Sequence, residues 1–390
     1  MAEAKELPPL PPLRCAGIGL RGSGYPNAIN TLRRLQAAGA RIDDCVDWLP
    51  EGFHLWKASR GPLPTKLALY ARLLFGNARA AWRLCRLSRK DRRITYIPYP
   101  AIFLLWWLSW VPRRWCPPLV ADAYISVWDS TVRDRGLLGS GGMLGRLLQA
   151  FEARALRTAD VVLVDTAANR RWMIDTFRLE PGSVFAVPLA IDDAALLEVP
   201  PRTPEKPLQV LFVGTFVPLH GIDVLVEAVR RAQAHDNIQF HFVGDGQDAD
   251  KVEALLSDGL TNFTWERGWI SHGQIADRLA QCDVCLGVFG GSAKAARVLP
   301  FKLYLALAAG RAVITQEKLS LPEGVALPPF TIVESNPEQV VEHLLVLAND
   351  PDRVTNSGRE GRSFYQAWLG SEASLRTWRD VLARVSTKPN

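Results

Sequence analysis

Glycines and cations in the second half of the chain are spaced as an anion-binding site would require. Gly214 ends an apolar run and Gly221 precedes a helix pattern, an arrangement that presents free main-chain N–H groups to an anion such as a nucleotide diphosphate. Lys294, Arg297 and Lys302 lie at the start of a later helix pattern. Cations there would stabilise a leaving diphosphate without a metal ion. A plain strand-to-helix turn and a solvated basic loop are the alternative interpretations.

One carboxylate in the first half stands where cleft chemistry is expected. The run ADAYISVW (121–128) predicts a strand, and Asp129 follows it directly in WDSTVRDR. Ligands of open α/β sheets bind beyond the carboxyl ends of the strands, so Asp129 could bind an acceptor hydroxyl or act as its base. It could instead cap the segment that follows.

The elements that must position these residues form two successive α/β halves. In each half, apolar strand patterns alternate with helix patterns, which predicts two Rossmann-like domains facing a central cleft. We expect one domain over 1–192, a linker over 193–207, a second domain over 208–370, and a helix over 371–390 that packs back toward the first domain. The predicted strands are 14–20, 93–98, 121–128 and 160–165, then 208–214, 238–244, 263–268, 284–288 and 312–315.

The sequence resembles a known enzyme family over nearly its whole length. The segments VLFVGTFVPLHGIDVL, HFVGDGQ, GWISHGQIADRLAQCDVCLGVFG and KAARVLPFKLYLALAAGRAVIT occur in this order. They resemble the donor-binding domain of family 4 glycosyltransferases of the GT-B fold, in a subgroup with GTFxPLHG and KAxRVxPxKxY motifs. The first half is similar too, with a glycine turn after the first strand and the run WDSTVRDR.

The resemblance implies a metal-independent, retaining glycosyltransferase with no cofactor beyond its nucleotide-sugar substrate. It implies that 1–192 is the acceptor-side domain and 208–370 the nucleotide-sugar-binding domain, and that Asp129, Lys294 and Lys302 are catalytic. Many relatives carry Glu where this chain has Arg297 and Leu305, and the second Glu typically holds the ribose hydroxyls, which Leu305 cannot do. A non-catalytic scaffold or partner subunit is therefore the alternative. The implied donor-binding residues are Gly22, Gly24, Gly214, Thr215, Phe216, His220, Gly244, Trp269, Ile270, Lys294, Arg297, Lys302 and Tyr304.

The charge is concentrated in one segment. The 390 residues carry a net charge of +6, of which the segment 57–93 holds +10 (11 Lys and Arg against one Asp), so the remainder sums to −4. On a helical wheel over 67–86, Arg72, Arg79, Arg83 and Arg86 share one arc. This basic stripe predicts contact with an anionic membrane surface and no affinity for nucleic acid. An ordinary surface helix packed on the sheet is the alternative.

Other features limit the remaining classes of function. The N-terminus is proline-rich and lacks a basic start, the longest apolar run (101–111) is about half of a bilayer span, and six cysteines are sparse for this length. Neither His nor Cys shows zinc spacing, so no metal site is expected. We therefore expect a cytoplasmic protein that is peripheral on the inner face of the cytoplasmic membrane. Together with the resemblance, this predicts that it glycosylates a lipid-linked saccharide in cell-surface polysaccharide biosynthesis.

Overall fold

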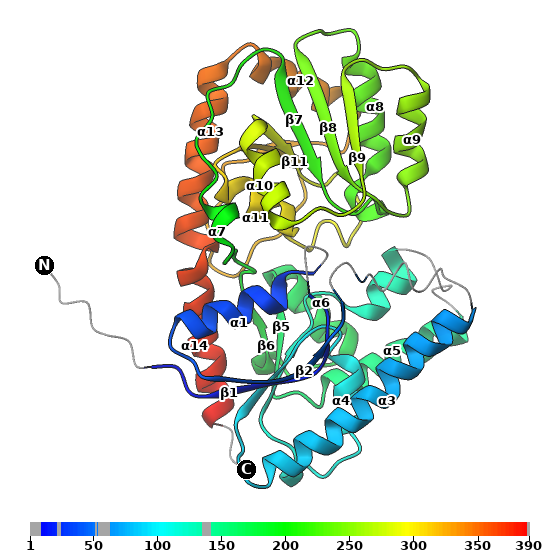
Figure 1. Ribbon diagram of the computed structural model, residues 1–390, viewed down its shortest axis with the longest axis vertical. Coiled ribbons are helices and arrows are strands. Elements are labelled where there is room, and N and C mark those ends of the chain that lie inside the picture. Colours follow the sequence, from blue (N-terminus) through cyan, green and yellow to red (C-terminus); the bar gives the residue numbers. More distant parts are fainter. Residues whose placement is uncertain (1–8, 22–24, 51–52, 54–62, 135–141, 388–390) are drawn as a thin grey trace, which may run out of the picture.

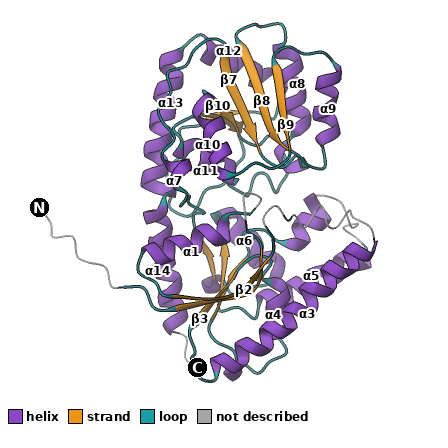
Figure 2. Cartoon of the chain, in the orientation of Figure 1, coloured by secondary structure: helices purple, strands orange, loops and turns teal. Residues whose placement is uncertain are grey.

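Each half of the chain contributes one parallel β-sheet to the structure (Figure 1). The computed structural model describes residues 9–21, 25–50, 53, 63–134 and 142–387. Within these residues each sheet has six strands, and helices cover both faces (Figure 2). The strands of the first sheet are β1 (Leu13–Gly19), β2 (Ile42–Trp48), β3 (Ile94–Ile97), β4 (Leu119–Asp122), β5 (Val161–Val164) and β6 (Val184–Ala186). Those of the second are β7 (Leu208–Val213), β8 (Ile238–Gly244), β9 (Phe263–Arg267), β10 (Val284–Leu286), β11 (Ala312–Gln316) and β12 (Thr331–Val333).

The helices follow the strands in the alternation that parallel sheets require. In the first half they are α1 (Asn27–Ala37), α3 (Leu63–Ser88), α4 (Ile102–Leu108), α5 (Met143–Leu156), α6 (Ala167–Phe177) and α7 (Ala194–Leu197). The second half contains α8 (Ile222–Ala232), α9 (Ala249–Ser257), α10 (His272–Gln281), α11 (Phe301–Ala308), α12 (Pro337–Ala348), α13 (Pro351–Phe364) and α14 (Ser371–Thr387). Short 3-10 turns are η1 (Arg113–Trp115), η3 (Pro181–Ser183) and η4 (Pro218–His220), and π-helical turns are η2 (Asp129–Asp134) and η5 (Tyr365–Leu369).

The strand orders place a topological switch point in each sheet. The orders are β2-β1-β3-β4-β5-β6 and β12-β11-β10-β7-β8-β9. Chain direction along the sheet reverses between β1 and β3 in the first and between β7 and β10 in the second. Ligands of such sheets bind in the crevice beyond the carboxyl strand ends at this point. The predicted class, two Rossmann-like α/β domains, is confirmed.

The end of the chain connects the two halves. Helix α13 packs on β11 of the second sheet, and α14 continues alongside α1 and β6 of the first (Figure 1). Arg34 on α1 is almost fully buried, and its Nη1 donates to the Ser374 hydroxyl at 2.6 Å. Its Nη2 donates to the Leu189 carbonyl at 2.9 Å and to Asp192 Oδ2 at 2.6 Å. One guanidinium thus ties the first domain, the crossover segment and the last helix together.

Two sequence expectations need correction. The strand expected over 121–128 ends at Asp122, because that carboxylate accepts hydrogen bonds from Tyr25 (2.6 Å) and Tyr96 (2.9 Å) and the chain turns away. The N–H groups of Val127 and Trp128 then bond to the Glu152 carboxylate at 3.0 and 2.6 Å, so they cannot join a sheet. The segment expected as a linker contains α7 and buries Leu196 and Val199 in the core.

Candidate functional site

A cavity opens at the carboxyl ends of β7 and β8, beside the switch point of the second sheet. Its wall combines strand ends with the first turns of α10 and α11, and Pro26 of the first domain closes one side. Seven of the residues predicted to bind the donor line this wall: Gly214, Thr215, His220, Gly244, Trp269, Ile270 and Lys302.

Gly214 and Gly244 let two strand ends approach closely. Both have positive φ, +152° and +141°. A Cβ on Gly244 would lie 2.0 Å from the Gly214 carbonyl oxygen, and one on Gly214 would lie 2.9 Å from Lys302 Nζ. Glycine is therefore required at both positions. The resulting wall is bare main chain, against which a flat ligand can lie.

The structure corrects the expectation that the glycines of this turn present free N–H groups. The Gly214 N–H donates to the Val243 carbonyl at 3.0 Å, and the Gly221 N–H donates to the Pro218 carbonyl at 3.1 Å. His220 Nδ1 donates to the Thr215 carbonyl. These two glycine N–H groups are therefore engaged, and a positive charge for an anion in the cavity has to come from a side chain.

Lys302 is that side chain. Its Nζ lies 3.5 Å from the centre of the Phe212 ring and makes no hydrogen bond to any described residue. Burial lowers the pKa of this ammonium well below its usual value, with the nearby Cys285 thiol opposing the shift. A buried amine without a counterion gains most from an anionic ligand, because the ligand restores its charged form.

Lys294 and Arg297 instead cross to the first domain. Lys294 Nζ donates to Ser130 Oγ at 2.9 Å and to Asp134 Oδ2 at 3.0 Å. Arg297 Nη2 donates to Asp129 Oδ2 at 2.8 Å. All four charged side chains are largely buried. The cations predicted for the donor and the carboxylate predicted for the acceptor therefore neutralise one another across the cleft.

Further first-domain groups hold this junction. The Arg297 guanidinium lies 4.2 Å over the Trp172 ring, and burial lowers its pKa. Asp165 Oδ2 accepts the Leu299 N–H at 3.2 Å, and the Thr166 hydroxyl donates to the Arg297 carbonyl. Burial raises the pKa of Asp165 to about 6. The whole loop before α11 is thus docked on the carboxyl end of β5.

Asp129 owes its position to a residue that the sequence did not reveal. Glu152 of α5 is fully buried, and its carboxylate holds the N–H groups of Val127 and Trp128 just before Asp129. Burial raises the pKa of Glu152 to about 7. No spacing links a helix residue to a loop 24 residues away, so only the structure shows this support.

The remaining predicted residues lie elsewhere. Tyr304 is fully buried, and its hydroxyl accepts the Leu189 N–H at 3.4 Å, so it does not line the cavity. Phe216 is also buried, against Phe212 and beside Trp265. Gly22 and Gly24 lie outside the described residues.

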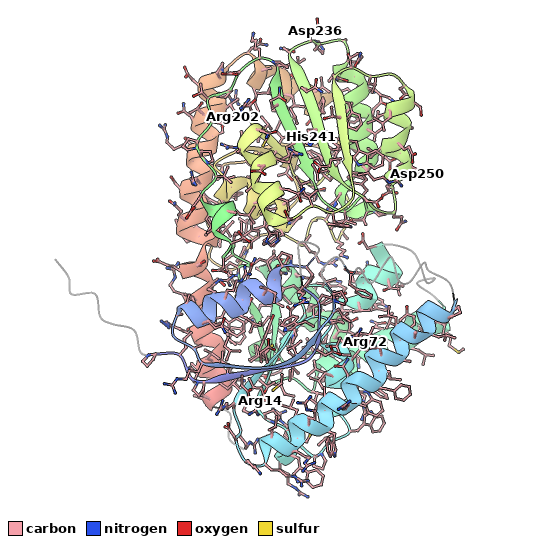
Figure 3. The ribbon with its side chains drawn as sticks, viewed as in Figure 1. Arg14, Arg72, Arg202, Asp236, His241 and Asp250 are labelled. Atoms are coloured by element: carbon pink, nitrogen blue, oxygen red, sulfur yellow. The ribbon has the colours of Figure 1, made fainter. Side chains whose placement is uncertain are left out.

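The four arginines of the basic stripe are exposed on α3, where Figure 3 labels Arg72. Arg72 pairs with Asp47 of β2 at 3.2 Å. Five large apolar residues of the same helix are exposed as well: Leu67, Tyr70, Phe75, Trp82 and Leu87. No helix among the described residues combines the length and apolar character needed to cross a bilayer. In the same residues, no three His, Cys, Asp or Glu side chains are grouped as a metal site requires.

The second half of the chain is similar in sequence to known glycosyltransferases. Residues 207–350 match the family model described as "Glycosyl transferases group 1". A D-inositol 3-phosphate glycosyltransferase from Geodermatophilus obscurus is 27% identical over 183 residues, which cover 42% of this chain and 40% of the relative. The chain thus spans less than half the length of the curated relatives it matches.

Solved structures extend the likeness to the whole fold. Anabaena Alr3699/HepE in complex with UDP and glucose has a TM-score of 0.66 at 11% identity, over 95% of this chain and 99% of that one. WaaG, a glycosyltransferase involved in lipopolysaccharide biosynthesis, has a TM-score of 0.62 at 16% identity, with the same coverage. The fold is therefore the GT-B fold of these structures, two parallel-sheet Rossmann-like domains.

Proposed function

We propose that this protein transfers a sugar from a nucleotide-sugar to a saccharide acceptor, with retention of configuration and without a metal ion. The observation that carries the proposal is Lys302, a buried amine on the wall of a cavity at the carboxyl ends of β7 and β8, with no counterion among the described residues. A diphosphate is the ligand that such a site favours, because it supplies the missing charge in a desolvated place. UDP in complex with similarly folded proteins supports the same assignment.

The reaction needs the charged side chains at the junction of the two domains as well as the cavity. The bond from the anomeric carbon to the diphosphate breaks, a bond to the acceptor oxygen forms on the same face, and the acceptor proton passes to the leaving diphosphate. Lys294 and Arg297 would stabilise that diphosphate, and Asp129 would orient the acceptor hydroxyl. Donor phosphates and the carboxylates of Asp129 and Asp134 would then compete for the same two cations.

The acceptor that we propose is a lipid-linked saccharide at the cytoplasmic face of a membrane. Helix α3 supports this proposal because it exposes four arginines beside large apolar side chains. Nearby, Trp110 is 62% exposed, and the Arg154 guanidinium lies 3.7 Å over its ring. Exposed tryptophan paired with arginine suits the interface of an anionic bilayer.

A non-catalytic scaffold or partner subunit is the second candidate. Leu305 favours it, because this apolar side chain lines the cavity where relatives typically have a carboxylate for the ribose. Binding and turnover distinguish the candidates. Thermal-shift measurements with nucleoside diphosphates should show stabilisation by at least one of them, and hydrolysis of the matching nucleotide-sugar should release that diphosphate. Stabilisation without hydrolysis or transfer would favour the scaffold, and no stabilisation by any diphosphate would contradict both the donor site and the enzyme.

Membrane association is tested separately. Replacing Arg72, Arg79, Arg83 and Arg86 by Gln should lower binding to liposomes that contain phosphatidylglycerol, since each charge contributes about 1 kcal/mol at an anionic surface. The matched control replaces four exposed arginines of the second domain, Arg230, Arg231, Arg353 and Arg359. Equal binding by both variants would reject α3 as the docking element.

A further inference from the structure

The donor cavity has a cationic end and an apolar end, and the boundary lies on α11. Lys302 and Leu305 are three residues apart on this helix, and both line the cavity. Residues at i and i+3 share a helix face and are about 4.5 Å apart along its axis. In a nucleoside diphosphate the pentose directly follows the phosphates. With the phosphates at Lys302, the pentose can reach Leu305.

The wall at this end offers few partners for pentose hydroxyl groups. Among the described residues, no carboxylate and no side-chain amide lines the cavity. Ile270, Ile275 and Phe301 also line the cavity and belong to the same apolar cluster as Leu305. Thr215 and His220 belong to the turn at Gly214, which Lys302 approaches. A ribose diol placed here would lose its bonds to water without regaining them.

His272 is the exception. Its Nδ1 donates to Asp193 Oδ2 at 3.0 Å. Its Nε2 is buried, has no hydrogen-bond partner among the described residues, and belongs to a ring on the cavity wall. A histidine Nε2 can donate or accept one hydrogen bond, and a pentose hydroxyl can do either. The ring therefore offers one hydrogen-bonding atom on the cavity wall, enough for one hydroxyl group.

We infer that the cavity binds a 2′-deoxynucleoside diphosphate at least as tightly as the corresponding ribonucleoside diphosphate. The inference rests on the proposed function and narrows its donor to a 2′-deoxynucleoside diphosphate sugar. His272 Nε2 forms a hydrogen bond with the remaining pentose hydroxyl, while Leu305 packs against the carbon that has no hydroxyl. A 2′-hydroxyl group in this place would be buried without a hydrogen-bond partner. This would weaken the affinity for the ribonucleotide by about tenfold or more.

The test measures dissociation constants by isothermal titration calorimetry for three matched pairs: UDP and dUDP, GDP and dGDP, ADP and dADP. For the base that binds, the deoxy member should bind as tightly as the ribo member or more tightly. A ribo member that binds fivefold or more tightly overturns the inference while leaving the proposed function intact. A chain that binds neither member of any pair overturns the proposed function itself.

Variants at the two residues complete the test. Leu305→Gln adds a neutral acceptor and should shift the ribo-to-deoxy affinity ratio toward ribose by about fivefold or more, as should Leu305→Glu if the buried charge is tolerated. Leu305→Met, the apolar control, should leave the ratio unchanged. His272→Phe should weaken both members about equally. An unchanged ratio in folded Leu305→Gln, or unchanged affinity in folded His272→Phe, would refute the assignment of the pentose to this end.

Discussion

Arg297 Nη2 and Asp129 Oδ2 meet at 2.8 Å, although the two residues are 168 positions apart and belong to different domains. Their side chains are 12% and 5% exposed, so the pair lies out of reach of bulk solvent. Lys294 and Asp134 form a second pair at 3.0 Å in the same junction. The two domains are thus joined by charges that the proposed reaction also requires.

Breaking the Arg297–Asp129 pair should be costly. Asp129→Asn and Arg297→Gln should each lower the free energy of unfolding by about 3 kcal/mol, because each leaves one buried charge without its partner. The double variant should lose less than the sum of the single losses, since both charges are then gone. Urea unfolding of the four proteins measures this coupling, with exposed Arg353→Gln as control. Additive losses would show that the pair is not energetically coupled.

Diphosphate binding should take up a proton at Lys302. The pKa of this amine is lowered by burial, and a bound anion raises it again, so binding strengthens as the pH falls toward the lowered pKa. Calorimetry in buffers of different ionisation enthalpy should show uptake of about one proton more in the wild type than in Lys302→Met. Equal uptake would mean that Lys302 is charged before the ligand arrives.

The stability of the fold should depend on pH through Glu152. Burial raises its pKa to about 7 in the folded chain, above the ordinary value for Glu, so the folded state holds the proton that the unfolded state releases. The contribution to stability is therefore largest at low pH and is lost as the pH rises toward 7. Between pH 7.5 and 5.5 the wild type should gain about 2 kcal/mol that Glu152→Gln does not. Parallel pH profiles of the two proteins would contradict this.

Arg34 should matter more than its neighbour Arg33 on the same helix. Arg34 is 2% exposed and binds three groups, whereas the Arg33 side chain is 55% exposed and lies 4.0 Å from Asp193. Arg34→Met should cost about 3 kcal/mol or more because it removes the cation that pairs with the Asp192 carboxylate. Arg33→Met should cost less than about 1 kcal/mol. Comparable losses in chemical unfolding would show that the tie between α1 and α14 contributes little.

The sequence was sufficient for the fold because apolar strands and glycine turns alternate regularly in both halves. The sequence did not reveal β2. This edge strand contains Asp43, Asp44 and Asp47, so it lacks the apolar pattern of the other strands. The sequence placed Gly214, Gly244 and Lys302 at one cavity because all three adjoin strand or helix ends.

The pairing of Lys294 and Arg297 with first-domain acids could not be predicted. Such pairing depends on how the two domains meet, and no local pattern records that. The support of Asp129 by Glu152 was hidden for the same reason. Residues that line a cavity at strand ends can thus be predicted from the sequence, whereas contacts between domains cannot.

The central claim is that this chain moves a sugar from a nucleotide-sugar, and the most direct measurement is release of the nucleoside diphosphate. Purified protein would be incubated with nucleotide-sugars, both ribo and 2′-deoxy, and the free diphosphate followed by a coupled assay beside Lys302→Met. We predict release by the wild type with at least one donor and a strong reduction in the variant, because the leaving diphosphate loses its buried cation. No release from any donor, or equal release by the variant, would contradict the account.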